Sequence, residues 1–227
     1  SLKHIEINLG IQPNHYNHLF DVEVKHASTS TYYNPKELDQ ILKGKHANLI
    51  DAFRETLNHS IFKWDIHRNK EDFRNIVLDQ VKFLAEKGYG AMAYPEAYGG
   101  NNDMEGYAHM FENMMYVDGS LTIKFGVQFG LFGGSIQKLG TKEHHDKYLT
   151  DTGKTALLGC FAMTETGHGS NVRGIKTTAT YDKATDQIII HTPGKNDNKE
   201  YIGNALHSKM ASVFASAQEL YSKSAPR

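Results

Sequence analysis

The chain has 227 residues, of which 39% are hydrophobic and 22% charged, and its formal net charge is −1. These values fit a soluble globular protein with one large or two small domains, and they argue against binding to nucleic acid or to an anionic membrane. No apolar run is long enough to span a membrane. The single cysteine, Cys160, excludes an intramolecular disulfide and fits a reducing compartment.

The chain is expected to begin with an irregular N-terminal arm over residues 1–33, with a candidate short strand at residues 21–24. A disordered tail is the alternative for this stretch. The first residues contain no long apolar core, so no secretory signal is visible.

A helical N-terminal domain is predicted for residues 34–152. Its first helix begins at Asn34, because Asn34 can cap, Pro35 suits the first helical position and Glu37 can reach back to the cap. Apolar residues then recur on one helical face: Leu38, Ile41, Leu42, Leu49, Ile50, Phe53 and Leu57. Further helices are expected from about Asn69 to Gly88, at 104–116, at 121–139 and at 141–149, and Thr141 can cap the last of them.

The hydrophobic period changes near residues 151–154, where a second domain is expected to begin. Strands are predicted at 156–163, 177–181, 187–192 and 211–215, with a hairpin turn at 182–186. The predicted fold class is therefore α+β, with the helical domain followed by a partial antiparallel β-domain at 153–215. Residues 216–227 form a tail that we assign to neither domain.

The strand ending at Met163 leads into a polar turn, Thr164-Glu165-Thr166-Gly167-His168-Gly169-Ser170. Its two glycines allow a close approach of the backbone to a ligand, and successive N–H groups in such a turn can bind an anion. Its short hydroxyl side chains add compact hydrogen-bond donors. The turn is therefore a candidate site for an electron-rich ligand.

The segment from Phe161 to Ser170 resembles the flavin- and acyl-CoA-binding loop of the acyl-CoA dehydrogenase and acyl-CoA oxidase superfamily. The residues that follow, 171–182, resemble the oxidase branch in particular. Other segments match family landmarks in order and spacing: 86–90, 95–100, 139–143 and, as the second flavin loop, 199–205. The resemblance covers roughly residues 34–215.

The resemblance implies an acyl-CoA dehydrogenase-like fold that lacks its C-terminal helical bundle, so the chain is expected to be an N-terminal fragment. It implies FAD as cofactor, and the residues expected to contact FAD are Phe161, Met163, Thr164, Gly169, Tyr201, Ile202 and Gly203. Ser170 is expected to contact the phosphate region of acyl-CoA. The family usually has Trp at the position of Tyr201, which keeps an aromatic face with less area.

The implied reaction oxidises a saturated acyl-CoA to the trans-2-enoyl-CoA, as in fatty acid β-oxidation. The family's catalytic base is a Glu in the C-terminal half, so we assign no catalytic residue within this chain. Glu165 is a carboxylate inside the motif, but we expect it to organise the loop rather than to act as the base.

The resemblance also implies an acyl-CoA substrate, oxygen or an electron-transfer protein as electron acceptor, and a homo-oligomer. The expected localisation is cytoplasmic, or peroxisomal if the protein is eukaryotic, although the last three residues do not match the usual peroxisomal address. The alternative function is a non-catalytic module of the same fold that binds acyl-CoA or a partner. A nucleic-acid-binding member of the superfamily is disfavoured by the net charge.

No metal site is predicted. The histidines, including the pair His144-His145, have no zinc-site spacing, and Cys160 is expected to be a buried, inert thiol.

The run from Phe125 to Gly134 mixes aromatic residues with glycines. That run could leave room for an acyl chain between helices, or it could serve helix packing alone.

Overall fold

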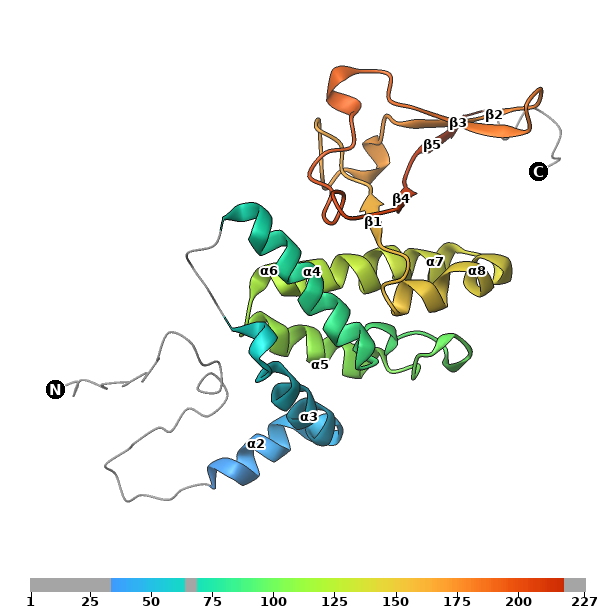
Figure 1. The fold of residues 1–227 in the computed structure, drawn as a ribbon. Helices are drawn as coiled ribbons and strands as arrows, with labels where there is room; N and C mark the ends of the chain where they lie inside the picture. The colour runs from blue at the N-terminus through green and yellow to red at the C-terminus, as the bar shows by residue number, and fades with distance from the viewer. Residues whose placement is uncertain (1–33, 64–68, 219–227) are drawn as a thin grey trace. The chain divides into compact units, whose positions relative to one another are not determined.

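The computed structural model describes residues 34–63 and 69–218 (Figure 1). The predicted arm with its strand at 21–24, and the end of the tail from residue 219, lie outside the described residues. The chain divides between Phe125 and Gly126 into two compact units, each of which is described by itself below. The predicted change from helices to strands at 151–154 falls inside the second unit.

The first unit is helical, as predicted. Its α-helices are α2 (Pro35–Lys43), α3 (Ala47–Leu57), α4 (Lys70–Glu86), α5 (Met104–Met115) and α6 (Gly119–Phe125). Its 3-10 helices are η1 (Gly44–His46), η2 (Ser60–Phe62), η3 (Tyr89–Ala91) and η4 (Glu96–Tyr98). The predicted cap is present, since the side chain of Asn34 accepts from Lys36 N. The structure also shows a cap at Asn69, whose side chain accepts from Asp72 N.

The single helix predicted from Asn34 to Leu57 is wrong, because the chain breaks at Gly44. Gly44 has φ 57° and ends α2, and a left-handed residue there favours glycine. The break also splits the predicted apolar face. Ile50, Phe53 and Leu57 of α3 are buried, whereas Ile41 and Leu42 of α2 are 74% and 75% exposed.

The core of the first unit forms where α3, α4, α5 and α6 meet, since α4 packs on α6 and α5 packs on both α3 and α6. Its large side chains with no more than 1% exposure are Phe53, Leu57, Phe62, Val81, Leu84, Tyr94, Met110, Met114, Leu121 and Phe125. Burial of these side chains is the main force that stabilises the unit.

The second unit begins with a π-helix, η5 (Gly126–Phe132), followed by α7 (Gly133–Leu139) and α8 (Lys142–Gly153). The sequence predicted an unbroken helix over 121–139, so the π-helical segment is a correction. Thr141 caps α8 as predicted, in a capping box with His144. No helix in the described part of the chain is long and apolar enough to cross a membrane.

The described residues after α8 contain five strands: β1 (Gly159–Ala162), β2 (Thr178–Asp182), β3 (Gln187–His191), β4 (Met210–Val213) and β5 (Ser216–Gln218). β5 lies at the start of the unassigned tail and was not predicted. The α+β class is confirmed, but the strand pairing is mixed. β2 and β3 pair antiparallel through the predicted hairpin, whereas β1 pairs with β4, and β2 with β5, in parallel.

The parallel pairs have a physical reason. Parallel neighbours need a crossover of a dozen or more residues, and the long connection between β3 and β4 provides one. This connection also contains the segment that resembles the second flavin loop. The path of the chain therefore brings that segment back beside β1.

β1 lies close to η5, and this contact requires a glycine. A Cβ atom built on Gly159 would collide with the ring of Phe132, which is fully buried. A side chain at this position would have to move either the strand or the aromatic ring.

We expect Gly159→Ala to lower the free energy of unfolding by about 1–3 kcal/mol, because the added methyl group overpacks a rigid contact. The control is Gly134→Ala in α7, where a Cβ atom meets nothing within 4 Å. Urea unfolding of both variants checks the prediction. Equal stabilities of the two variants would contradict it.

Candidate functional site

The two predicted ligand-binding segments lie side by side at the end of β1. The ammonium group of Lys199 donates to the Met163 carbonyl at 2.9 Å, and Glu200 N donates to the Thr164 carbonyl at 3.3 Å. Two residues beyond Thr164, Thr166 N donates to the Asn198 carbonyl at 2.9 Å. The turn that follows β1 and the segment around 198–200 are therefore joined by several hydrogen bonds.

The second segment also reaches the beginning of β1. Asn204 Nδ2 donates to the Gly159 carbonyl at 2.7 Å, while Lys199 contacts Met163 just beyond the end of the strand. Residues 199–204 thus extend along the whole of β1. β4 pairs with β1 in parallel.

Glu165 is the centre of the turn. Its carboxylate is fully buried and accepts hydrogen bonds from Lys176 N at 2.8 Å and from Thr177 N and Oγ1 at 2.8 and 2.6 Å. The ammonium group of Lys199 lies 3.1 Å from the same carboxylate. Glu165 therefore links three separate stretches of chain, in agreement with the expectation that it organises the loop.

These contacts keep the Glu165 carboxylate ionised. Burial works to raise its pKa, but the hydrogen bonds from Thr177, Lys176 and Lys199 outweigh burial and lower the pKa to about 2. Such a group is a poor proton acceptor near neutral pH, because a base needs a pKa close to the working pH. The geometry thus agrees with rejecting Glu165 as the base.

The turn itself is closed by a reciprocal pair of backbone hydrogen bonds between Glu165 and His168. Nε2 of His168 lies 2.9 Å from the Gly174 carbonyl and 3.3 Å from the Glu165 carboxylate. Nδ1 of the same ring is buried and has no hydrogen-bond partner within the described residues. With Nε2 donating, Nδ1 is an acceptor that a ligand donor could satisfy.

Two predicted donors of the turn are available. Among residues 34–63 and 69–218, the hydroxyl groups of Thr164 and Ser170 have no hydrogen-bond partner. Gly169 has open space where a Cβ atom would be. Thr164 is half-buried, whereas Gly169 and Ser170 are exposed.

The predicted residues of the second segment adopt an unusual backbone. Tyr201 has φ 58° although it is a bulky residue, and its side chain is 81% exposed. Gly203 lies close to η5, since a Cβ atom there would be 3.0 Å from Val127 Cγ2. Strained backbone of this kind is concentrated at functional sites, so Tyr201 is a stronger candidate than its sequence alone suggested.

Phe161 and Met163 occupy the strand and the residue just beyond it, and both are half-buried. The ring of Phe161 packs against Phe214, with ring centroids 4.6 Å apart. Ile202 is half-buried between Tyr201 and Gly203. The predicted cofactor residues are thus gathered on β1, on the turn after it and on the segment beside it.

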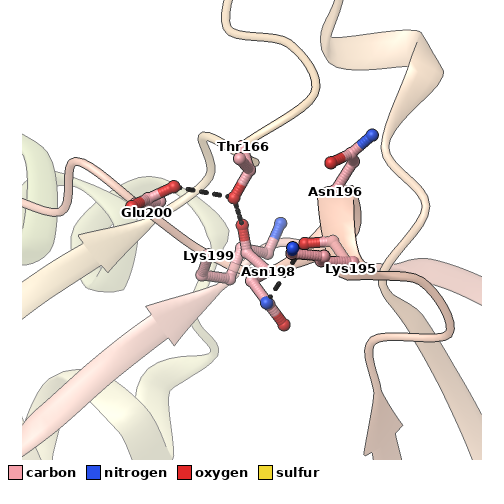
Figure 2. Close-up of a pocket in the computed structure, with 6 residues that line it drawn as sticks. All are labelled: Thr166, Lys195, Asn196, Asn198, Lys199 and Glu200. Carbon is pink, nitrogen blue, oxygen red and sulfur yellow. Dashed lines mark hydrogen bonds between the residues drawn. The ribbon is translucent and has the colours of Figure 1, made fainter.

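An open hollow of about 370 Å³ lies beside the junction of the two segments. Figure 2 shows the residues that line it: Thr166, Lys195, Asn196, Asn198, Lys199 and Glu200. The hydroxyl group of Thr166 donates to Glu200 and to the Asn198 carbonyl. None of the predicted FAD-contacting residues lines this hollow.

Lys199 and Asn204 belong to the segment that resembles the second flavin loop, but the sequence predicted no role for their side chains. It predicted no role for Gln128 either. Each acts through partners that are distant in the sequence: Lys199 and Glu165 are 34 residues apart, and Asn204 and Gln128 are 76 apart. Cys160 is buried as expected. Within the described residues, no group of three or more His, Cys, Asp or Glu side chains is placed to hold a metal ion.

We expect Glu165→Gln to lower the free energy of unfolding at neutral pH by about 3–5 kcal/mol, because Lys199 would keep a buried charge without its partner. The wild-type advantage over this variant should shrink as the pH falls from about 4.5 to about 2, since the depressed pKa stabilises the folded state only while the carboxylate is ionised.

Urea unfolding as a function of pH tests this prediction. The control is Glu200→Gln, because Glu200 is exposed and its loss should change stability by no more than about 0.5 kcal/mol. A wild-type advantage over Glu165→Gln that stays constant between pH 5 and pH 2 would contradict the assignment.

Comparisons with known proteins identify the family. Residues 44–155 match the sequence model of the family "Acyl-CoA dehydrogenase, N-terminal domain". Peroxisomal acyl-coenzyme A oxidase 2 of Arabidopsis thaliana is 39% identical over 185 residues, which are 80% of this chain and 26% of that protein. The chain therefore spans about a quarter of the length of this relative.

Solved structures give the same result. The crystal structure of acyl-CoA oxidase 3 from Yarrowia lipolytica superposes with a TM-score of 0.65 and 32% identity, over 80% of this chain and 26% of that chain. An acyl-CoA dehydrogenase from Bacillus anthracis, solved in complex with FAD, shares the fold with a TM-score of 0.62 and 22% identity, over 76% of this chain and 29% of that chain. The chain belongs to the acyl-CoA dehydrogenase and acyl-CoA oxidase superfamily, on the oxidase branch.

Proposed function

We propose that the protein is an FAD-dependent oxidoreductase that converts a saturated acyl-CoA to the trans-2-enoyl-CoA. The observation that supports this most is the contact between the two predicted flavin segments, in which Lys199 and Glu200 bond to the carbonyl groups of Met163 and Thr164. Similarity to acyl-CoA oxidases supports acyl-CoA oxidation in fatty acid metabolism as the general activity.

The residues present fit FAD. The turn offers the Thr164 hydroxyl and His168 Nδ1, neither of which has a hydrogen-bond partner among the described residues, and open space at Gly169. The neighbouring segment offers the exposed ring of Tyr201 and a close backbone approach at Gly203. An aromatic face together with short donors suits a flat, polar ring system.

In this proposal Thr164 would donate to the flavin ring and would stabilise negative charge on it. Tyr201, Ile202 and Gly203 would hold the ring from the second segment, and Phe161 and Met163 would hold it from β1 and the residue after it. FAD would supply the acceptor for the hydride that leaves the β-carbon of the substrate. The Ser170 hydroxyl, which has no partner among the described residues, would donate to a phosphate of the acyl-CoA.

The α-proton of the substrate needs a carboxylate base, and no described residue is assigned to this role. Glu165 is unsuitable, since its oxygens are already occupied by Thr177, Lys176 and Lys199. By resemblance, the base of the family is a Glu in its C-terminal half. The thioester carbonyl assists by delocalising the charge that remains after proton removal.

Residues 171–182, which follow the turn, resemble the oxidase branch. This resemblance favours oxygen over an electron-transfer protein as the electron acceptor. We further propose a homo-oligomer, and a peroxisomal location if the protein is eukaryotic, as for the similar Arabidopsis enzyme.

The test uses the full-length protein. We expect the purified protein to show flavin absorbance, to bleach when acyl-CoA is added without oxygen, and to release peroxide under air. Free coenzyme A is the matched control and should not bleach the flavin, because it carries no acyl chain to oxidise.

A folded, colourless protein that still binds acyl-CoA would overturn the proposal in favour of the non-catalytic module. Bleaching without peroxide release, together with turnover by an electron-transfer protein, would retain the oxidation of acyl-CoA and reject oxygen as the acceptor.

A further inference from the structure

Gln128 is a fully buried amide in the π-helix η5, and the proposed function gives it no role. Its Nε2 donates to the carbonyl groups of Thr152 and Leu157 at 3.2 and 2.8 Å. Its Oε1 accepts from Gly159 N at 3.0 Å and from Asn204 Nδ2 at 3.3 Å. An amide side chain has two donors and two sites for acceptance, and all four are used here.

Asn204 connects this buried amide to the strained segment. Its backbone is left-handed, with φ 66°, and its Nδ2 donates both to the Gly159 carbonyl and to Gln128 Oε1. Asn204 therefore fixes the end of the segment 201–204 to the beginning of β1 and to η5 at the same time.

The other end of that segment is fixed as well. Lys199 bonds to the Met163 carbonyl and to Glu165, two residues before Tyr201. Between the two fixed ends lie Tyr201, with its left-handed backbone and exposed ring, and Gly203, which contacts Val127 beside Gln128. Strained residues persist when the surrounding structure over-determines them.

The π-helix explains how Gln128 reaches this position. A π-helical turn changes the direction in which side chains leave a helix, and such turns are frequent at functional sites. In η5, neighbouring residues contact the second segment, Val127 at Gly203 and Gln128 at Asn204. In a regular α-helix, the side chains of Val127 and Gln128 would point in different directions relative to β1 than they do in η5.

We propose that Gln128 and Asn204 are positioning residues that hold the segment Tyr201–Gly203 in its ligand-binding shape. The inference rests on the proposed function for its cofactor and on the contacts above for its anchor. Neither residue is proposed to touch FAD or the substrate.

Asn204 carries the test, because Gln128→Met would remove four hydrogen bonds from a buried site and would threaten folding. Two variants separate the possible causes. Asn204→Asp keeps a residue that tolerates the left-handed backbone but replaces the donor by an acceptor, and Asn204→Gly removes the side chain and adds backbone freedom.

The matched controls are Asn102→Asp and Asn102→Gly. Asn102 is also left-handed, with φ 55°, but it is exposed, lies in the first unit and has no part in the proposed site.

The measurements use full-length protein. We expect both Asn204 variants to exchange amide hydrogens faster at residues 201–208 than the wild type, and to bind FAD about tenfold more weakly, as for the loss of one or two hydrogen bonds. The flavin absorbance bands should also shift. Both Asn102 variants should match the wild type in each measurement.

Unchanged exchange at 201–208 in Asn204→Asp would overturn the anchor. Faster exchange with unchanged FAD affinity would overturn its role in positioning the cofactor site. A wild type that binds no FAD would defeat the proposed function, while faster exchange in the Asn204 variants would still support the anchor.

Discussion

The site depends on the buried ion pair between Glu165 and Lys199. Lys199 comes from the long connection between β3 and β4, and Glu165 comes from the turn after β1, so the pair ties two distant segments together. The hydrogen bonds from Thr177 and Lys176 satisfy the rest of the carboxylate. A buried charge without these partners would destabilise the fold, so the contact allows few alternative arrangements of the two segments.

β1 fixes the distance between the two anchored ends of the second segment. Lys199 is bonded just beyond its end and Asn204 at its beginning, and the residues between them are held along the strand. Gly159 allows β1 to lie against Phe132 of η5, which places Gln128 within reach of Asn204. The same contacts therefore pack the second unit and set the shape of the candidate site.

Features that depend on neighbouring residues, such as helix caps and tight turns, were predictable from the sequence. The caps at Asn34 and Thr141 and the hairpin at 182–186 follow from neighbouring residues, and each is present. The break at Gly44 was missed because the apolar periodicity continues across it.

Features that depend on distant contacts were not predictable. The π-helix has no distinct hydrophobic period, and the parallel pairs β1–β4 and β2–β5 are set by where a long connection returns. For the site, the glycine and hydroxyl pattern identified the turn and the second segment. The partners that hold them, Lys199, Gln128 and Asn204, needed the fold.

In our proposal, the turn at Thr164 and the segment at Tyr201–Gly203 together hold a flavin ring. A crystal structure of the full-length protein with FAD bound is the most direct test. We expect the protein atoms nearest to the ring to belong to residues 163–164 and 201–203, with Lys199 still bonded to Glu165. A ring bound elsewhere, with packed side chains filling the space between these two segments, would contradict it.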